Sequence, residues 1–207
     1  MIGAEPRRST PARFPIQRVA QNLHLGHLVR VPFTYEYPRP AVTVDTVLAT
    51  AGARGELRVL LVERGQAPFG GAWALPGGFI NVHEDLETAA RREMLEETHV
   101  ALGPMVQLGA YGAPHRDPRG HTVGVAFLAI CDPDDVQPRA GDDAADCRWF
   151  AARRPPKLAF DHSAILRDAR QMFQQLAADE REFQRAFAGR RRPDWIERVR
   201  SAARDAS

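Results

Sequence analysis

The chain has 207 residues, 44% of them hydrophobic, and a net charge of +2 at pH 7. This length and composition exclude a fully disordered protein and favour one globular domain with extensions. No apolar run approaches the roughly 20 residues that span a bilayer, and the first residues lack the apolar block of a secretory signal. An Arg-rich start is also typical of a transit peptide, but arginine is frequent along the whole chain. We therefore expect a cytoplasmic protein with no membrane partner.

Charge and proline content divide the chain into three parts. Residues 1–37 are rich in arginine and proline, which predicts an N-terminal extension. Residues 38–178 show the periodic apolar pattern of a domain and carry more acidic than basic side chains. Residues 179–207 are basic again, and breaks at Gly189 and Pro193 predict two short helices in this C-terminal extension.

Strands dominate the first part of the domain. β-Branched and aliphatic residues predict two strands, 41–50 and 57–64, which a Gly-containing turn joins into a hairpin. A loop follows, with a short strand at 73–75 and a Gly-Gly turn at 77–78. These segments lead the chain to a helix.

That helix covers 85–98, with Asp85 as its N-cap. After it, alternating and apolar segments predict three more strands, at 104–112, 121–131 and 145–150. A second long helix begins near His162, where apolar residues recur at helical spacing. The elements together indicate a mixed domain with strands in the majority before residue 150.

Three carboxylates gather on the helix predicted over 85–98. At about 100° per residue, Glu93, Glu96 and Glu97 fall on one side of it. Apolar residues elsewhere on the helix let it lie against a core while the carboxylates face outward. Like charges this close repel one another unless a cation joins them. The helix therefore predicts a cation site.

The spacing around these glutamates is specific. Gly78 is followed after five residues by Glu84 and, after seven more, by Arg92 and Glu93, with two further glutamates next on the helix. This pattern resembles the Nudix box, the signature of hydrolases that cut a nucleoside diphosphate linked to another group. The resemblance implies an α/β (α+β) Nudix fold over 38–178, a mixed β-sheet sandwiched between helices.

One position departs from the pattern of the box. The family normally has Gly at its end, where this chain has His99. Gly there would be the left-handed residue that ends the helix, and His tolerates that conformation at a cost of about 1 kcal/mol. The change removes no carboxylate, so we expect it to affect only the local turn.

The resemblance implies a site for Mg²⁺ or Mn²⁺. A pyrophosphate link is polyanionic, so its hydrolysis needs hard divalent cations, which prefer oxygen ligands. The implied ligands are the carboxylates of Glu93 and Glu97 and the carbonyl of Gly78, with Glu96 as a further or water-mediated ligand. A solvated acidic helix face is the plain alternative, and the complete spacing argues against it.

Two further catalytic roles follow from the resemblance. Arg92 would hold the neighbouring carboxylates in position. The general base is open: in this family it is a box glutamate such as Glu93 or an acidic residue of a later loop. The loop candidates, which could equally be surface turn residues, are Asp142, Asp143 and Asp146.

Substrate recognition must come from residues outside the box. Guanidinium groups suited to phosphate or carboxylate are those of Arg64, Arg116 and Arg119. Rings that could stack on a base, or could simply pack, are those of Phe79, Phe160 and His162. Asp117 is either a further contact or a turn residue before Pro118. The surrounding segments resemble the bacterial Nudix subgroup associated with ADP-ribose hydrolysis and its regulatory relatives.

The resemblance favours a hydrolase that converts ADP-ribose to AMP and ribose 5-phosphate. A pyrophosphatase for nucleoside triphosphates or other dinucleotides is the alternative, because the box handles the phosphates and not the group beyond them. A sensor that binds ADP-ribose and regulates DNA would need a winged helix, for which the tail is short. We expect a small nucleotide partner and no specific nucleic acid, because a basic tail alone predicts only weak, salt-sensitive binding.

The two extensions have two open roles, which are covering an apolar surface and building a homodimer. Nudix enzymes of this type often share their substrate pocket across a dimer. The tail has a small apolar face suited to either role, formed by Trp195, Ile196 and Val199.

Overall fold

The structure, a computed structural model, describes residues 35–132, 134–141, 144–187 and 194–205. Residues 37–207 form one compact unit, and the description below concerns that unit. The N-terminal extension predicted over 1–37 lies almost wholly outside the described residues. No helix in the described ranges combines the length and the apolar character that crossing a membrane requires.

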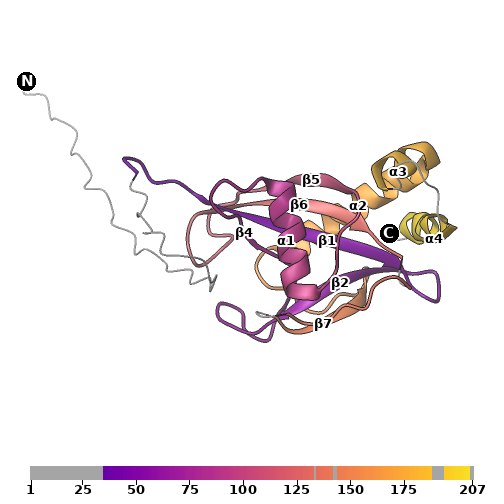
Figure 1. Ribbon diagram of the computed structural model, residues 1–207, viewed down its shortest axis with the longest axis horizontal. Helices are drawn as coiled ribbons and strands as arrows, with labels where there is room; N and C mark the ends of the chain where they lie inside the picture. The colour runs from indigo at the N-terminus through magenta and orange to yellow at the C-terminus, as the bar shows by residue number, and fades with distance from the viewer. Residues whose placement is uncertain (1–34, 133, 142–143, 188–193, 206–207) are drawn as a thin grey trace, which may run out of the picture. The chain divides into compact units, whose positions relative to one another are not determined.

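A mixed sheet forms the centre of the unit (Figure 1). Its main path runs β3-β2-β1-β6-β5, with β4 paired to β1 and β7 paired to β2. Among the named strands of the described residues, the β1–β6 pair is parallel and the other pairs are antiparallel. The strands are β1 Ala41–Ala51, β2 Leu57–Arg64, β3 Trp73–Ala74, β4 Gly77–Phe79, β5 Met105–Tyr111, β6 Thr122–Ile130 and β7 Ala144–Ala151.

Helices cover both faces of this sheet, as the side chains of β1 show. Val47 and Ala49 pack in a cluster with residues of the later helices, whereas Val44 and Leu48 pack with residues of α1. Successive side chains of a strand point to opposite faces, so a strand covered on both faces places apolar residues on both of them. The helices are α1 Leu86–Thr98, α2 His162–Ala178, α3 Glu180–Phe187 and α4 Asp194–Arg204. A mixed sheet between helices confirms the predicted fold class.

The chain that leads into α1 differs from the prediction. The glycines at 77–78 were expected to form a turn, but they lie in β4, where Val44 of β1 is opposite Gly78. A Cβ on Gly77 would overlap the Val44 carbonyl oxygen, so Gly is needed here for close approach of two strands. The pairing places β4 directly beside the buried centre of the sheet.

Both ends of α1 agree with the sequence. Asp85 is the N-cap, and its Oδ1 accepts the backbone N–H of Thr88 at 3.0 Å. His99 ends the helix in the left-handed conformation, with φ 58°, and its N–H donates to the carbonyl oxygen of Leu95 at 2.9 Å. The histidine at the end of the box therefore takes the backbone role expected of glycine.

The C-terminal residues form the two expected short helices, α3 and α4, and the break predicted at Gly189 and Pro193 lies outside the described residues. Both helices belong to the same hydrophobic cluster as α2 and the sheet. Ile196 and Val199 are 2% and 0% exposed, so the apolar face of the tail is already covered within the chain.

Candidate active site

Arg92 organises the acidic side of α1. Its Nε and Nη2 each donate to one oxygen of Glu84 at 2.8 Å, and its Nη1 donates to Glu93 Oε1 at 2.6 Å. Nη1 also donates to Glu96 Oε2 at 3.0 Å, and Nη2 to the carbonyl oxygen of Phe79 at 3.0 Å. One guanidinium thus ties the helix to the end of β4 and to the loop before the helix.

The three clustered glutamates have different surroundings. Glu93 is largely buried, and burial raises its pKa although Arg92 acts in the opposite direction. Its Oε2 would lie 2.5 Å from a Cβ on Gly78, so the glycine makes room for this carboxylate. Glu97 Oε2 accepts the N–H of Gly77 at 3.0 Å, whereas Glu96 is about half exposed. β4 and α1 therefore meet through their glycines and glutamates.

These donors fit a hard divalent cation, because they are carboxylate oxygens beside a glycine backbone. The described residues hold no group of three His, Cys, Asp or Glu side chains that already converge on one point. Glu93 instead bonds Arg92, and Glu97 bonds the Gly77 N–H. A cation would therefore compete with contacts within the chain for the same oxygens.

The acidic loop before β7 docks on the end of α1. Gly141 donates its N–H to the carbonyl oxygen of Glu97 at 2.9 Å. Asp142 and Asp143, two candidates for the general base, lie outside the described residues. Asp146 lies on β7, where its carboxylate pairs with Arg148, which lowers the pKa of Asp146.

The predicted substrate residues form two groups, and the first is an arginine–aromatic cluster. The guanidinium carbon of Arg64 lies 4.9 Å from the ring centre of Phe160, and that of Arg119 lies 5.3 Å from it. Arg119 also lies 4.8 Å from the ring centre of Phe79. Asp117 holds Arg119 by a bidentate ion pair. This cluster continues to the acidic site, because the carbonyl of Phe79 is bonded to the box arginine.

The second group is buried below the cluster. Arg116 donates to both carboxylate oxygens of Asp161, at 2.8 and 2.7 Å, and only 5% of its side chain is exposed. His162 accepts the N–H of Leu75 through Nδ1 at 2.9 Å, and burial lowers its pKa. The structure therefore places these two residues behind the surface, in contact with other parts of the chain.

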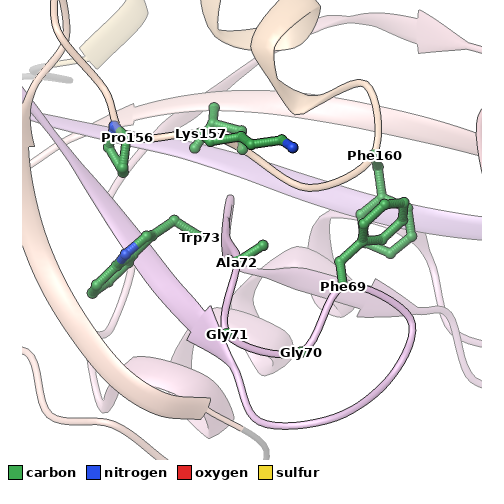
Figure 2. A pocket seen from close by; sticks show the side chains of 9 residues that line it. Phe69, Gly70, Gly71, Ala72, Trp73, Pro156, Lys157 and Phe160 are labelled. Carbon is green, nitrogen blue, oxygen red and sulfur yellow. The ribbon is translucent and has the colours of Figure 1, made fainter.

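A pocket of about 580 Å³ adjoins Phe160 (Figure 2). Phe69 comes from the loop between β2 and β3, Trp73 from β3 itself, and Lys157 from the segment before α2. The Phe69 and Phe160 rings are in edge contact, with centroids 4.9 Å apart. Sequence reasoning did not single out Phe69, Trp73 or Lys157 as site residues. The usable signal was Phe69 beside Gly70 and Gly71, in a segment predicted only as loop, and Trp73, predicted only as part of a short strand.

Comparisons with known proteins agree with this geometry. Residues 39–169 match the family model described as NUDIX domain. An ADP-ribose pyrophosphatase of Methanocaldococcus jannaschii is 41% identical over 132 residues, which are 64% of this chain and 74% of that protein. The ADPR responsive transcriptional repressor NtrR of Acinetobacter baylyi is 33% identical over 138 residues, 65% of this chain and 54% of the repressor.

Two solved structures show the same fold. A MutT/nudix family protein of Enterococcus faecalis has a TM-score of 0.67 at 32% identity, covering 75% of this chain and 70% of that chain. The NUDIX domain of Shewanella oneidensis NrtR, in complex with ADP ribose, has a TM-score of 0.60 at 34% identity, covering 66% and 90%. The chain therefore belongs to the NUDIX family. In activity it is a Nudix hydrolase, an enzyme of the pyrophosphohydrolase class.

Proposed function

We propose that the protein hydrolyses ADP-ribose to AMP and ribose 5-phosphate in a metal-dependent reaction. The observation that carries this proposal is the continuity of the site, in which Phe79 joins the arginine–aromatic cluster to Arg92 and the box glutamates. A nucleotide needs both an aromatic surface for its base and cationic groups for its diphosphate. The 41% identity to an ADP-ribose pyrophosphatase supports the same substrate.

Glu93, Glu97 and the carbonyl of Gly78 would hold Mg²⁺ or Mn²⁺, with Glu96 as a further or water-mediated ligand. The bound metal would neutralise pyrophosphate oxygens and lower the pKa of water. Arg92 keeps the carboxylates of Glu84 and Glu93 at fixed positions beside β4.

A general base must take one proton from the water that attacks phosphorus, while the P–O bond to the second phosphate breaks. The largely buried Glu93 is one candidate for this base. The other candidates are Asp146 on β7 and, next to Gly141 in the sequence, Asp142 and Asp143. Replacing each in turn and measuring kcat decides between them.

Substrate binding is assigned to the arginine–aromatic cluster. Phe160 and Phe79 supply ring faces for the base, and Arg64 and Arg119 supply charge for the diphosphate. Asp117 positions Arg119, while the buried residues Arg116 and His162 support the cluster from behind.

A substrate panel tests the proposed function. Purified protein with millimolar Mg²⁺ is given ADP-ribose, 8-oxo-dGTP and a dinucleotide, and the released nucleotides and phosphates are separated chromatographically. AMP formed from ADP-ribose with the highest kcat/KM supports the proposal. Preferential cleavage of 8-oxo-dGTP would favour the triphosphate alternative, which a 38% identity over 99 residues to a putative 8-oxo-dGTP diphosphatase of Bacillus subtilis also raises.

Glu97→Gln tests the metal site, because the substitution keeps the side-chain shape and removes the charge. We expect kcat to fall by at least about a hundredfold at millimolar Mg²⁺ with the circular dichroism spectrum unchanged. Glu87→Gln is the matched control, since Glu87 is an exposed glutamate in the first turn of the same helix. Full activity of Glu97→Gln would contradict the assigned metal site.

A regulatory function is the second candidate, favoured by the likeness to the repressor NtrR. Gel-shift titration with promoter DNA at moderate salt separates it from catalysis. We expect only weak binding that salt abolishes, because a basic tail attracts DNA without reading its sequence.

Two further proposals concern the oligomeric state and the location of the protein. We propose that the protein is a homodimer to which the N-terminal arm, residues 1–37, contributes, since the apolar face of the tail 179–207 is already covered within residues 37–207. Light scattering of the full chain and of a chain lacking the arm tests this. We also propose a cytoplasmic location, in keeping with a nucleotide substrate.

A further inference from the structure

Asp45 is a buried acid at the centre of the sheet. It lies on β1, the strand between β2 and β6, and is 6% exposed. Burial raises the pKa of Asp45, whereas His162 and Arg116 lower it. A carboxylate is costly at such a place unless it has charged or hydrogen-bonding partners. Neither the apolar pattern of β1 nor the Nudix box accounts for an acid at this position.

Two buried side chains face the Asp45 carboxylate. Nη2 of Arg116 lies 3.8 Å from Oδ2, and Nε2 of His162 lies 3.4 Å from Oδ1. Because Nδ1 of His162 accepts the N–H of Leu75, the proton of the neutral ring is on Nε2 and faces Asp45. Arg116 is held from its other side by the bidentate pair with Asp161. The four charged or imidazole groups thus form one network.

β6 leaves space for this network at Gly124. A Cβ there would lie 2.7 Å from Nη1 of Arg116 and 3.1 Å from Oδ2 of Asp45. Glycine weakens a strand interior and often marks a close approach. Gly124 pairs with Thr43 of β1, so the gap lies beside the part of the strand that carries the acid.

The network is connected to both sides of the arginine–aromatic cluster. Arg116 is in the loop that carries Arg119, and Asp161 directly follows Phe160, a non-glycine residue held at φ 51°. Through the N–H of Leu75 the network also holds the chain just before β4. Asp45 pairs through its backbone with Gly77 of β4, whereas its side chain faces Arg116 and His162, which support the cluster.

We infer that Asp45 is a positioning residue of the active site, which fixes Arg116 and His162 and thereby sets Arg119 and Phe160 against β4. The inference rests on the proposed function, because that function gives Arg119 and Phe160 their contact with the nucleotide. Asp45 acts on substrate affinity and leaves the metal site unchanged.

Asp45→Asn tests the inference, since it keeps the side-chain shape and removes the charge that holds Arg116. The KM for ADP-ribose rises at least about tenfold, while kcat changes less than about threefold. The Mg²⁺ concentration for half-maximal rate stays unchanged. A residue that only stabilised the fold would not separate KM from kcat in this way.

Two further variants make the test specific. Gly124→Ala displaces Arg116 without changing any charged group, so it raises KM in the same way and decides the question if Asp45→Asn does not fold. Thr50→Val is the matched control on β1, because it removes a buried hydrogen bond to the Cys131 carbonyl oxygen, at 2.9 Å, on the distal part of the strand. It lowers thermal stability and leaves KM unchanged.

An unchanged KM in a folded Asp45→Asn protein overturns the inference, and so does a loss of kcat with a shifted Mg²⁺ requirement. An equal rise of KM in Thr50→Val also overturns it, because general loosening of β1 would then be the cause. If the wild-type protein binds ADP-ribose without cutting it, the proposed function fails alone. The Kd for ADP-ribose is then measured by calorimetry in the presence of EDTA for the same variants, and these values decide the inference. If it neither binds nor cuts ADP-ribose, both fail.

Discussion

Arg92 uses every hydrogen-bond donor of its guanidinium. Two N–H groups bind Glu84, and the other three bind Glu93, Glu96 and the carbonyl oxygen of Phe79. The pKa of Arg92 is raised, chiefly by the hydrogen bonds that it donates to Glu84, so it stays charged at any physiological pH. A planar fork with five donors suits this arrangement, and an ammonium with three does not.

Replacing Arg92 with lysine should therefore keep the charge but lose the positioning. We expect Arg92→Lys to reduce kcat/KM at least about tenfold and to lower the free energy of unfolding by about 1–3 kcal/mol. Arg91→Lys is the control, because Arg91 is adjacent but bonds the carbonyls of Leu102 and Gly103, away from the glutamates. Steady-state kinetics and urea denaturation measure both effects, and equal behaviour of the two variants would contradict the role of Arg92.

The protonation of His162 is set by its buried contacts. Protonating Nδ1 would break the bond from the Leu75 N–H and leave two donors facing each other. Burial acts in the same direction, so the pKa of His162 lies below its usual value of 6.5. Its contribution to stability is therefore present above about pH 6.5 and is lost as the pH falls toward the lower folded-state pKa.

His162→Asn should remove this dependence, because the asparagine Oδ1 can still accept from Leu75 but does not titrate. Between about pH 7 and pH 5, the wild-type free energy of unfolding should fall more steeply than that of the variant. Asp45 acts in the opposite direction, since its pKa is raised, and remains in both proteins. Urea denaturation across this range makes the comparison, and parallel curves would rule out the assigned histidine titration.

At the scale of elements, α1 is held at its C-terminal end by the loop before β7. The last carbonyl groups of a helix have no partner within it. Here Gly141 and Arg139 donate their N–H groups to the carbonyl oxygens of Glu97 and Thr98, at 2.9 and 3.0 Å. The same turn of the helix carries proposed metal ligands, so the loop contributes to their placement.

Gly141→Ala should damage this contact, because a Cβ at Gly141 would overlap the carbonyl oxygen of Glu96. We expect the free energy of unfolding to fall by about 1–3 kcal/mol. Gly103→Ala is the matched control, since a Cβ at Gly103 meets no atom within 4 Å. Denaturant titration of both variants checks this, and an unaffected Gly141→Ala protein would mean that the loop does not press on α1 in solution.

Periodicity and capping residues were sufficient to predict most elements. β1, β2 and α1 follow from apolar patterns and from Asp85, and the left-handed end at His99 follows from the place of the box glycine. β4 was missed because Gly-Gly is a strong turn signal. The glycines are needed there for contact with β1 and with Glu93, which only the pairing of distant segments reveals.

At the scale of the whole unit, the C-terminal helices are part of the main core. Phe183 and Phe187 of α3 are 0% and 2% exposed, and their ring centroids are 5.0 Å apart. Phe173 of α2 lies 5.8 Å from Phe187 by the same measure. The basic composition of the tail concealed this packing, because the arginines lie between the buried positions.

Removing one of these rings should destabilise the unit as a whole. We expect Phe183→Ala to lower the free energy of unfolding by about 3–5 kcal/mol, with the transition still cooperative. Arg181→Ala, an exposed position on the same helix, should have little effect. Two separate transitions in the wild-type protein would instead mean that α3 and α4 fold independently of the sheet.

Only the folded structure distinguishes the predicted substrate residues that lie in the arginine–aromatic cluster from those that are buried behind it. Arg64 and Arg119 lie together over Phe160, whereas Arg116 is buried against carboxylates. In the sequence, a substrate-binding arginine and a buried, ion-paired arginine look alike, because the sequence does not show which acidic side chains face each of them. Asp45 carried no signal at all, since it stands alone in an apolar strand.

The space at Gly124 has a consequence for how related sequences should vary. The glycine, Asp45 and Arg116 are compatible only as a set, because any side chain at 124 would meet the guanidinium. In an alignment of the family, larger residues at 124 should therefore accompany a shorter residue at 116 and an uncharged one at 45. The three positions should change together during evolution, and a chimaera that exchanges only one of them should be the least stable combination.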